Sequence, residues 1–131
     1  MSYPDVDEWT RTSSLSAGHD LAEIAAALCD DKLAQQIVIL DMESVVGYTD
    51  AFVICTGQNS RQTRAIADEV ALKLKREHGL LPRGNEGQKE GDWILLDYVD
   101  CVIHIFTPEA REYYRLEQLW GQVPQRVYAS A

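Results

Sequence analysis

The sequence has few of the residues that would place it among secreted, membrane or nucleic-acid-binding proteins. Its three cysteines, Cys29, Cys55 and Cys101, are widely spaced and form no Cys-x-x-Cys pair. We expect them to be small buried residues in a reducing compartment. No apolar run approaches the roughly 20 residues that cross a bilayer. Basic residues number 12 against 21 acidic ones, a net charge of −9, which argues against a broad basic face for phosphate backbones and favours a basic protein partner.

The N-terminal segment also lacks the features of a targeting sequence. Residues 1–20 have no apolar core and carry Asp5, Asp7, Glu8 and Asp20, which fits neither a signal peptide nor an Arg-rich transit peptide. A cytoplasmic location is therefore expected. A chain of 131 residues with 46% hydrophobic residues suggests one domain, and we place it at 20–124, between a disordered tail at 1–19 and a C-terminal tail at 125–131.

Nucleotide and cofactor motifs are absent from the sequence. Residues 57–60, Gly-Gln-Asn-Ser, lack the Gly-Lys-Ser/Thr of a phosphate-binding loop. Gly84, Gly87 and Gly91 do not lead from a strand into a helix, as a dinucleotide-binding fingerprint does. The histidines show no metal-ligand spacing: His19 falls in the tail, His78 at a helix end and His104 within a strand, where a hydrogen bond to a neighbour is its expected role. No cofactor and no metal are predicted.

Alternating helical and strand patterns favour an α/β domain with a mixed sheet flanked by helices. Helices are expected from Leu21, capped by Asp20, and from Asn59 or Ser60 to Gly79; another starts at Thr107-Pro108-Glu109. Strands are expected at 37–40, 52–56, 93–96 and 101–106, with a turn at 47–50 and a glycine-rich loop at 82–92.

The most informative segment is 93–106, WILLDYVDCVIHIF. Two nearly all-apolar runs indicate strands in the buried middle of a sheet. The tetrad between them is short enough only for a tight turn, so the strands are expected to be antiparallel neighbours. The tip of this hairpin carries Asp97, Tyr98 and Asp100 and is either catalytic or a docking point.

Carboxylates provide the enzymatic alternative. Asp41 and Glu43 are two residues apart at a strand end, so both can point to one face and hold a divalent metal, as in nucleotidyl transferases. A third carboxylate could come from Asp97 or Asp100. Such enzymes also need a Gly-Ser turn to grip the triphosphate, and the chain contains no Gly-Ser pair.

The hairpin-tip carboxylates have a structural role available as well. An aspartate side chain can accept hydrogen bonds from nearby backbone amides and so stabilise a tight turn. Alternatively, Trp93 and Asp97 share one face of their strand, and an exposed Trp and Tyr beside carboxylates has the composition of an interface hot spot for a basic partner. Both interpretations remain open, as does an ordinary core position for Trp93.

Six motifs, in order, carry a resemblance to a known family. They are Thr49-Asp50-x-Phe52-Val53-Ile54-x-Thr56-Gly57, Ser60-Arg61, Gly84-x-Glu86-Gly87, Asp92-Trp93-Ile94-x-x-Asp97-Tyr98-x-Asp100, His104-x-Phe106, and Arg111-x-x-Tyr114-x-Leu116-Glu117-x-Leu119-Trp120. From about Leu21 to Gln122 the chain resembles the ribosomal silencing factor family, RsfS or Iojap. Many members have Gly where this chain has Val99, so its hairpin turn is expected to differ.

The resemblance implies a nucleotidyltransferase-like fold without catalytic residues, and a role that is not enzymatic. Members of the family bind the large ribosomal subunit through its basic ribosomal protein number fourteen, block association with the small subunit, and commonly form homodimers. For this chain it implies Trp93 as the apolar anchor and Asp97 and Asp100 as partners of Lys or Arg. Glu86 and Tyr98 are the expected supporting contacts.

Two other classes of function remain open on the sequence alone. One is a metal-dependent nucleotidyl transferase using the carboxylates at 41, 43, 97 and 100. The other is a nucleotide-binding or small-molecule-binding regulator that uses the loop at 82–92 as a lid.

Overall fold

The structure is a computed structural model that describes residues 17–45 and 47–129. Most of the tail predicted at 1–19 therefore lies outside the described residues. The elements, in chain order, are α2 (Ala17–Asp31), β1 (Gln35–Asp41), β2 (Ala51–Thr56), α3 (Ser60–His78), β3 (Gly84–Glu86), β4 (Trp93–Asp97), β5 (Cys101–Phe106), α4 (Pro108–Tyr114), α5 (Leu116–Leu119) and β6 (Gln125–Val127). None of the described helices is long and apolar enough to span a membrane.

The strands form one mixed sheet in the order β3-β4-β5-β2-β1-β6. Only β2 and β5 pair in parallel; the other neighbours are antiparallel. Every residue of β2 and β5 is buried, as their unbroken apolar runs predicted. The antiparallel pairing expected for the 93–106 hairpin is confirmed, with Trp93 opposite Phe106 and Asp97 opposite Val102.

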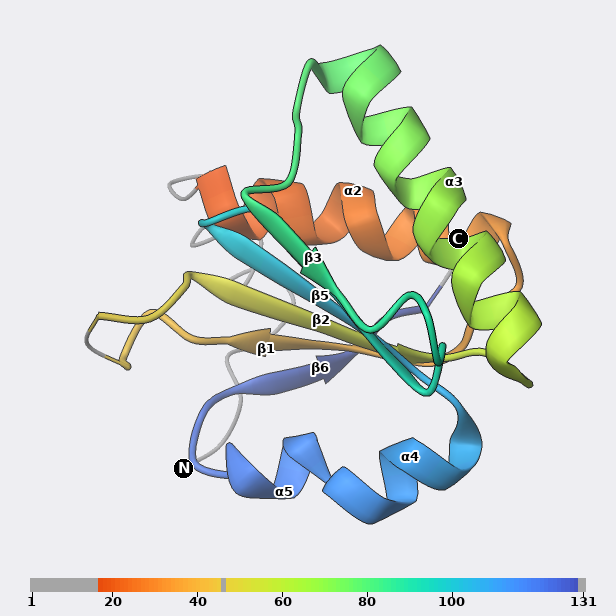
Figure 1. Ribbon diagram of the computed structural model, residues 1–131. Coiled ribbons are helices and arrows are strands. Elements are labelled where there is room, and N and C mark those ends of the chain that lie inside the picture. Colours follow the sequence, from red (N-terminus) through yellow and green to blue (C-terminus); the bar gives the residue numbers. More distant parts are fainter. Residues whose placement is uncertain (1–16, 46, 130–131) are drawn as a thin grey trace.

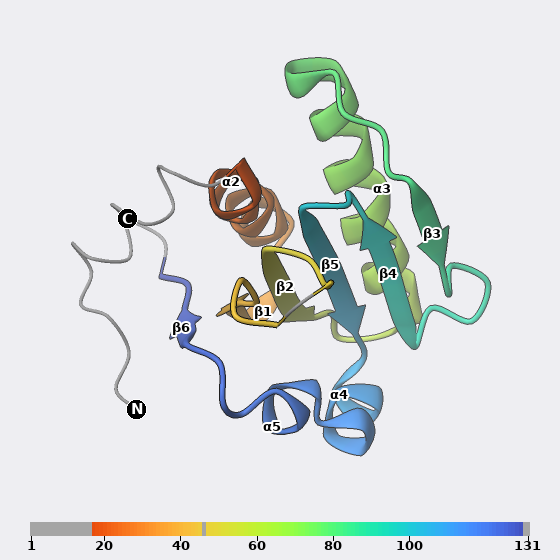
Figure 2. The same cartoon turned by 90° about the vertical axis from the view of Figure 1, so that its left-hand side faces the viewer.

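Helices lie on both faces of the sheet, but they cover them unequally. Figures 1 and 2 show α2 and α3 on one face and the short helices α4 and α5 on the other. The long helices bury a large cluster with one side of the sheet, including Val53, Ile66 and Ile103. A smaller cluster on the opposite side, including Phe52, Phe106 and Leu116, is covered by α4 and α5. The second face of the sheet is the one left partly open.

Helix ends follow the local signals in the sequence. The side chain of Asn59 accepts a hydrogen bond from the Gln62 amide at 2.9 Å and caps α3, which ends at Gly79 with φ 65°. Thr107 caps α4 and Pro108 occupies its first turn. The final helical stretch is two short helices, because Arg115 between them has φ 49°.

Three expected boundaries differ from the structure. Helix α2 begins at Ala17 rather than Leu21, so Asp20 lies inside its first turn and does not cap it. Residues 125–127, predicted as a tail, form β6 against β1. Residues 84–86, predicted as part of a loop, form β3 against β4. Each difference depends on tertiary pairing or packing that no local pattern shows.

The hairpin turn does carry an unusual residue at position 99. Val99 has φ 74°, in the left-handed region, and its side chain is 50% exposed. The Asp97 side chain accepts a hydrogen bond from the Val99 amide at 2.8 Å, and the Thr49 hydroxyl donates to the Val99 carbonyl at 2.8 Å. These bonds hold a β-branched residue in a conformation that costs of order 1–3 kcal/mol.

Replacing Val99 by Gly should therefore stabilise the protein. Glycine adopts positive φ without steric cost, and the exposed valine side chain contributes little burial, so we expect Val99→Gly to raise the free energy of unfolding by about 1 kcal/mol. Urea denaturation measures this. The matched control is Val127→Gly in β6, an exposed valine outside the left-handed region, where glycine should lower stability. A Val99→Gly variant no more stable than the parent would contradict the account of strain.

Candidate functional site

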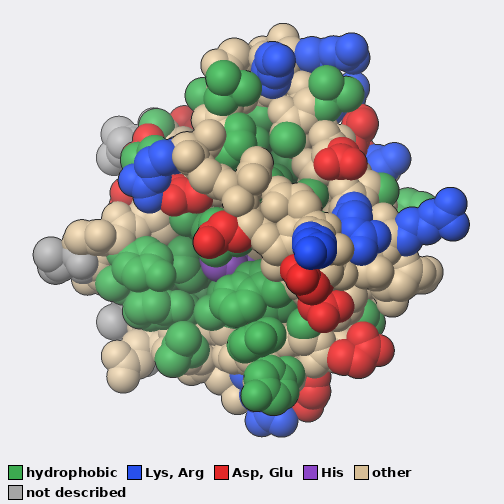
Figure 3. All heavy atoms as spheres, in the orientation of Figure 1, with side chains coloured by type: hydrophobic (Ala, Val, Ile, Leu, Met, Phe, Trp, Pro, Cys, Tyr) green, Lys and Arg blue, Asp and Glu red, His purple; other side chains and the backbone are tan. Residues whose placement is uncertain are grey.

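Six large side chains gather on the open face of the sheet, and we call this set the aromatic face. Its members are Tyr48, Trp93, Tyr113, Tyr114, Leu119 and Trp120. Tyr113 is 80% exposed and Leu119 is 70% exposed. Figure 3 shows hydrophobic side chains concentrated here, between the β1–β2 loop and the α4–α5 region. An exposed apolar concentration of this kind marks an interaction site more often than a solvated surface.

Ring contacts hold the aromatic face together in two groups. Tyr48 meets Phe52 and Trp120 edge-on, with ring centroids 5.6 and 5.4 Å apart. Trp93 stacks on Phe106 at 5.1 Å and meets Tyr114 at 4.7 Å. Both groups rest on the buried phenylalanines of the sheet, so the exposed rings are fixed in place before any partner arrives.

A hollow of about 380 Å³ opens beside the β4–β5 hairpin. Phe52, Leu95 and Val102 supply apolar lining, and His104 also faces it. Arg83, Glu86 and Asp97 contribute the charged lining residues. The hollow therefore combines an apolar floor with charges of both signs and an acidic excess.

Histidine 104 is uncharged and fixes the indole of Trp93. The Trp93 Nε1–H donates to His104 Nδ1 at 3.1 Å, so the imidazole carries its proton on Nε2. Burial lowers the pKa of His104 to about 3, which keeps it neutral near pH 7. Its Nε2 is buried with no hydrogen-bond partner among the described residues. The predicted hydrogen bond between His104 and a neighbour is confirmed, with His104 as the acceptor.

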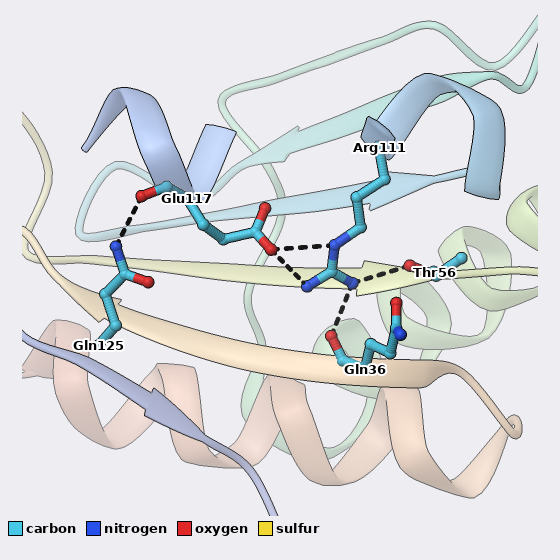
Figure 4. A network of polar contacts seen from close by, with 5 residues as sticks. All are labelled: Gln36, Thr56, Arg111, Glu117 and Gln125. Carbon is cyan, nitrogen blue, oxygen red and sulfur yellow. Dashed lines mark hydrogen bonds and ion pairs between the residues drawn. The ribbon is translucent and has the colours of Figure 1, made fainter. Parts of the chain in front are cut away.

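The guanidinium of Arg111 joins the two short helices to the sheet, as Figure 4 shows. Its Nε and Nη2 donate to one carboxylate oxygen of Glu117 at 3.2 and 2.9 Å. Its Nη1 donates to the Gln36 carbonyl at 2.6 Å and to the Thr56 hydroxyl at 2.8 Å. The Arg111 side chain is only 10% exposed. We call this set of contacts the Arg111 clamp.

The Arg111 clamp uses an irregularity in β1. The strand register shifts between Gln35 and Val38, and Gln36 has φ 52°, which turns its carbonyl toward the guanidinium. The side chain of Gln125 adds hydrogen bonds to the Glu117 and Trp120 carbonyls at 2.8 and 3.2 Å. The clamp therefore positions the segment that carries Tyr113, Tyr114, Leu119 and Trp120.

Three of the predicted site residues lie together on the open face. Trp93 is half-buried within the aromatic face, and Glu86 is exposed on β3 beside the hollow. Asp97 forms a 2.6 Å ion pair with Arg83. Burial raises the pKa of Asp97, but hydrogen bonds from the Val99 amide and Arg83 outweigh it and leave that pKa lowered. Asp97 thus performs the turn-stabilising role predicted for it.

The other two predicted residues are separated from this group. Asp100 is exposed at the turn, and its backbone carbonyl accepts bonds from the Asp50 and Ala51 amides at 3.1 and 3.3 Å. Tyr98 is 7% exposed and belongs to the cluster under α2 and α3. Tyr98 therefore lies on the opposite side of the sheet from Trp93, and its role as a supporting contact for a partner stays a prediction.

Sequence reasoning missed most of the aromatic face. Tyr48, Tyr113, Tyr114, Leu119 and Trp120 looked like ordinary helix and turn residues in the sequence. Their exposure depends on how far α4 and α5 extend over the sheet. The one available signal was the concentration of aromatic residues in two helices too short to bury them all.

The carboxylates at the end of β1 have a different neighbour from the one expected. His19 Nε2 lies 3.2 Å from an Asp41 carboxylate oxygen and 3.6 Å from one of Glu43. Burial lowers the pKa of His19, but its hydrogen bond to Asp41 and the nearby carboxylates leave that pKa raised. The prediction that Asp97 or Asp100 would complete this cluster is wrong for the described residues.

The loop at 82–92 is not a free lid, contrary to the regulator alternative. Residues 84–86 pair with β4, and the Arg64 guanidinium donates to the Gln88 and Lys89 carbonyls at 2.9 and 3.1 Å. These bonds fasten the segment to α3. The hollow beside it is open rather than covered.

Comparison with known proteins places the chain in a family. Residues 16–130 match the family described as "Ribosomal silencing factor during starvation". A "Ribosomal silencing factor RsfS" of Bacillus subtilis is 43% identical over 79% of this chain and 87% of its own length. One of Halalkalibacterium halodurans is 38% identical over 82% and 92% of the two chains. A crystal structure of a Chromobacterium violaceum protein superposes with TM-score 0.74 at 31% identity, covering 86% of this chain and 88% of that one.

Changing Arg111 to Lys should destabilise the fold measurably. A lysine ammonium cannot reproduce the planar fork that reaches Glu117, Gln36 and Thr56 together, so we expect the free energy of unfolding to fall by about 2 kcal/mol. Arg115→Lys is the matched control, because Arg115 is exposed and its guanidinium pairs, among the described residues, only with Glu112 of its own segment. This change should alter stability by less than about 0.5 kcal/mol. Equal effects of the two changes in urea denaturation would refute the clamp.

The neutral state of His104 makes stability depend on pH. The unfolded chain binds a proton at this residue below about pH 6.5, whereas the folded chain does so only near pH 3. Stability is therefore lost as pH falls through this window, by about 2 kcal/mol between pH 6.5 and 5. His104→Gln removes the titration. Measured by urea denaturation across this range, the free energy of unfolding should fall less for the variant than for the parent, by about 2 kcal/mol. Equal losses in the two proteins would show that folding does not lower the pKa of His104.

Proposed function

The chain belongs to the ribosomal silencing factor family, and from that premise we propose that it binds the large ribosomal subunit and blocks association with the small subunit. The contact on the ribosome is its ribosomal protein number fourteen, as the family resemblance implies. The bound domain occupies space that the small subunit needs, and translation falls as a result. No bond is made or broken in this mechanism, so no catalytic residue, metal or cofactor enters it.

The observation that carries the proposal is the aromatic face. Interface hot spots are enriched in Trp and Tyr packed at the centre of a patch, and this face supplies Trp93, Trp120 and three tyrosines, of which Tyr48 also lines the hollow. A stable protein interface covers about 1,200–2,000 Å² in total. The described helices leave part of this apolar face exposed, including Tyr48, Tyr113 and Tyr114.

Charge supports a basic partner. The chain carries a net charge of −9, and Glu86, Asp97 and Asp100 lie around the hollow and the hairpin tip. Asp97 already pairs with Arg83, so on docking a partner's Lys or Arg joins or replaces that exposed contact. Such complementarity mainly raises the association rate and makes it sensitive to salt.

Two further properties accompany this proposal. The proposed location is the cytoplasm, as for the ribosomes of its bacterial relatives, and the family resemblance implies a homodimer. Size-exclusion chromatography with light scattering tests the dimer on the free protein: a mass of twice one chain supports it, and a mass of one chain at micromolar concentration rejects it. Neither outcome alters the proposed ribosome contact.

Sedimentation with isolated ribosomal subunits tests the central proposal. The purified protein should pellet with the large subunit and not with the small one, and the bound fraction should fall as salt rises. A subunit-joining assay then asks whether the bound protein lowers the yield of joined ribosomes. Pelleting with neither subunit at any salt concentration, or with the small subunit alone, would overturn the proposal.

Replacing Trp93 by Ala should weaken binding to the large subunit by about 2 kcal/mol, roughly 30-fold, while the variant still unfolds cooperatively. Tyr113→Ala should also weaken binding. Because Tyr113 is exposed, this change should not affect folding. The control is Leu72→Ala, a partly exposed apolar residue on α3, which should bind as the parent does. A Trp93→Ala variant that fails to fold would return Trp93 to the core and remove it as the anchor.

A further inference from the structure

We propose that His19, Asp41 and Glu43 form a binding site for a divalent transition-metal ion, with Zn²⁺ the preferred occupant. The site lies where the first turn of α2 meets the end of β1, beside the hairpin turn. It is independent of the ribosome contact proposed above. These three are the one group of metal-ligating side chains found within ligand distance of one another among the described residues.

The spacing of the three donors fits a small ion. Nε2 of His19 is 3.2 Å from Asp41 Oδ1 and 3.6 Å from Glu43 Oε1, and all the donor atoms lie within 4.8 Å of one another. Zinc bonds of about 2.0–2.2 Å at tetrahedral angles place ligand atoms about 3.3 Å apart. Small side-chain adjustments therefore bring all three atoms into one coordination sphere, with water as the fourth ligand.

The imidazole is held in place by the packing of α2. Gly18, the residue before His19, packs closely against the hairpin turn. A Cβ at position 18 would lie 2.3 Å from the Asp100 carbonyl oxygen and 2.4 Å from Asp50 Cβ. The helix can approach this far only because residue 18 is glycine. His19 consequently points inward, with its side chain fully buried.

The carboxylates are oriented and open toward solvent. The Glu43 amide donates to Asp41 Oδ1 at 3.0 Å, which fixes that carboxylate in the way that outer hydrogen bonds fix metal ligands. The Asp41 side chain is 15% exposed and that of Glu43 is 39% exposed. An ion can therefore enter from the carboxylate side and keep a water molecule there.

Charge and ligand type select the ion. Among the described residues no Lys or Arg forms an ion pair with Asp41 or Glu43, so the two carboxylates form a local excess of negative charge. A dication balances this excess. Because one ligand is imidazole, Zn²⁺, Co²⁺ and Ni²⁺ are favoured over Mg²⁺ and Ca²⁺, which prefer all-oxygen sites.

A bound ion would cross-link α2 to β1 beside the hairpin turn. The Asp50 and Ala51 amides already join that turn to the β1–β2 connection. An ion that binds only the folded chain raises the melting temperature, and the rise grows with the logarithm of the free ion concentration above its Kd. Metal binding is thus expected to stabilise the support of the hairpin rather than to supply chemistry.

Titration of the full-length, chelator-treated protein with Co²⁺ and Zn²⁺ tests the site. We expect one equivalent of Co²⁺ to give the visible absorption bands of a four-coordinate ion, Zn²⁺ to displace it, and Zn²⁺ to raise the melting temperature while Mg²⁺ does not. Glu43→Gln and Asp41→Asn should each weaken Co²⁺ binding at least tenfold. Glu43 is partly exposed, so its variant should fold even if His19→Gln does not.

The controls are His78→Gln, an exposed histidine on α3, and Asp31→Asn, an exposed carboxylate at the end of α2; both should bind Co²⁺ as the parent does. No saturable Co²⁺ binding, or affinity that is unchanged in Glu43→Gln and Asp41→Asn, would overturn the proposal and leave His19 and Asp41 as a simple ion pair. Loss of binding in His78→Gln would also overturn it by placing the metal elsewhere. None of these readouts involves the ribosome.

Discussion

The Arg111 clamp is the contact on which the open face depends. Helices of seven and four residues have no stability of their own in water, so α4 and α5 exist because something holds them to the sheet. Apolar packing of buried residues such as Leu116 provides part of this attachment. The Arg111 guanidinium fixes the orientation of α4 and α5 on the sheet, because it binds Glu117, Gln36 and Thr56 at once. Through these contacts a bulge in β1 sets where the exposed aromatic rings stand.

Unequal coverage of the sheet creates the surface that the proposed function uses. Helices α2 and α3 are long enough to bury a large apolar cluster with one face of the sheet. The other face receives only α4 and α5, and the remaining area is closed by rings that are themselves part exposed. In the proposed function, a partner's surface completes that cover, and the burial of apolar area drives docking. There the acidic residues nearby would favour a basic partner, while the apolar rings would supply most of the affinity.

Local signals in the sequence predicted the elements whose structure is decided locally. The apolar runs of β4 and β5, the Asn59 cap and the Gly79 end of α3 follow from neighbouring residues alone. The missed features depend on distant partners. Strand β6 forms because β1 offers a free edge, and His19 is buried because Gly18 lets α2 reach the hairpin turn. The side of the sheet taken by Tyr98 is likewise set by the turn, where strand alternation ends.

Hydrogen–deuterium exchange of the protein bound to the large ribosomal subunit, compared with the free protein, tests the docking face most directly. The account predicts slower exchange in the β1–β2 loop around Tyr48, in the β4–β5 hairpin and in 113–120, with α3 unchanged because it lies on the far side of the sheet. Protection confined to α2 and α3, with the aromatic face exchanging as in the free protein, would contradict it.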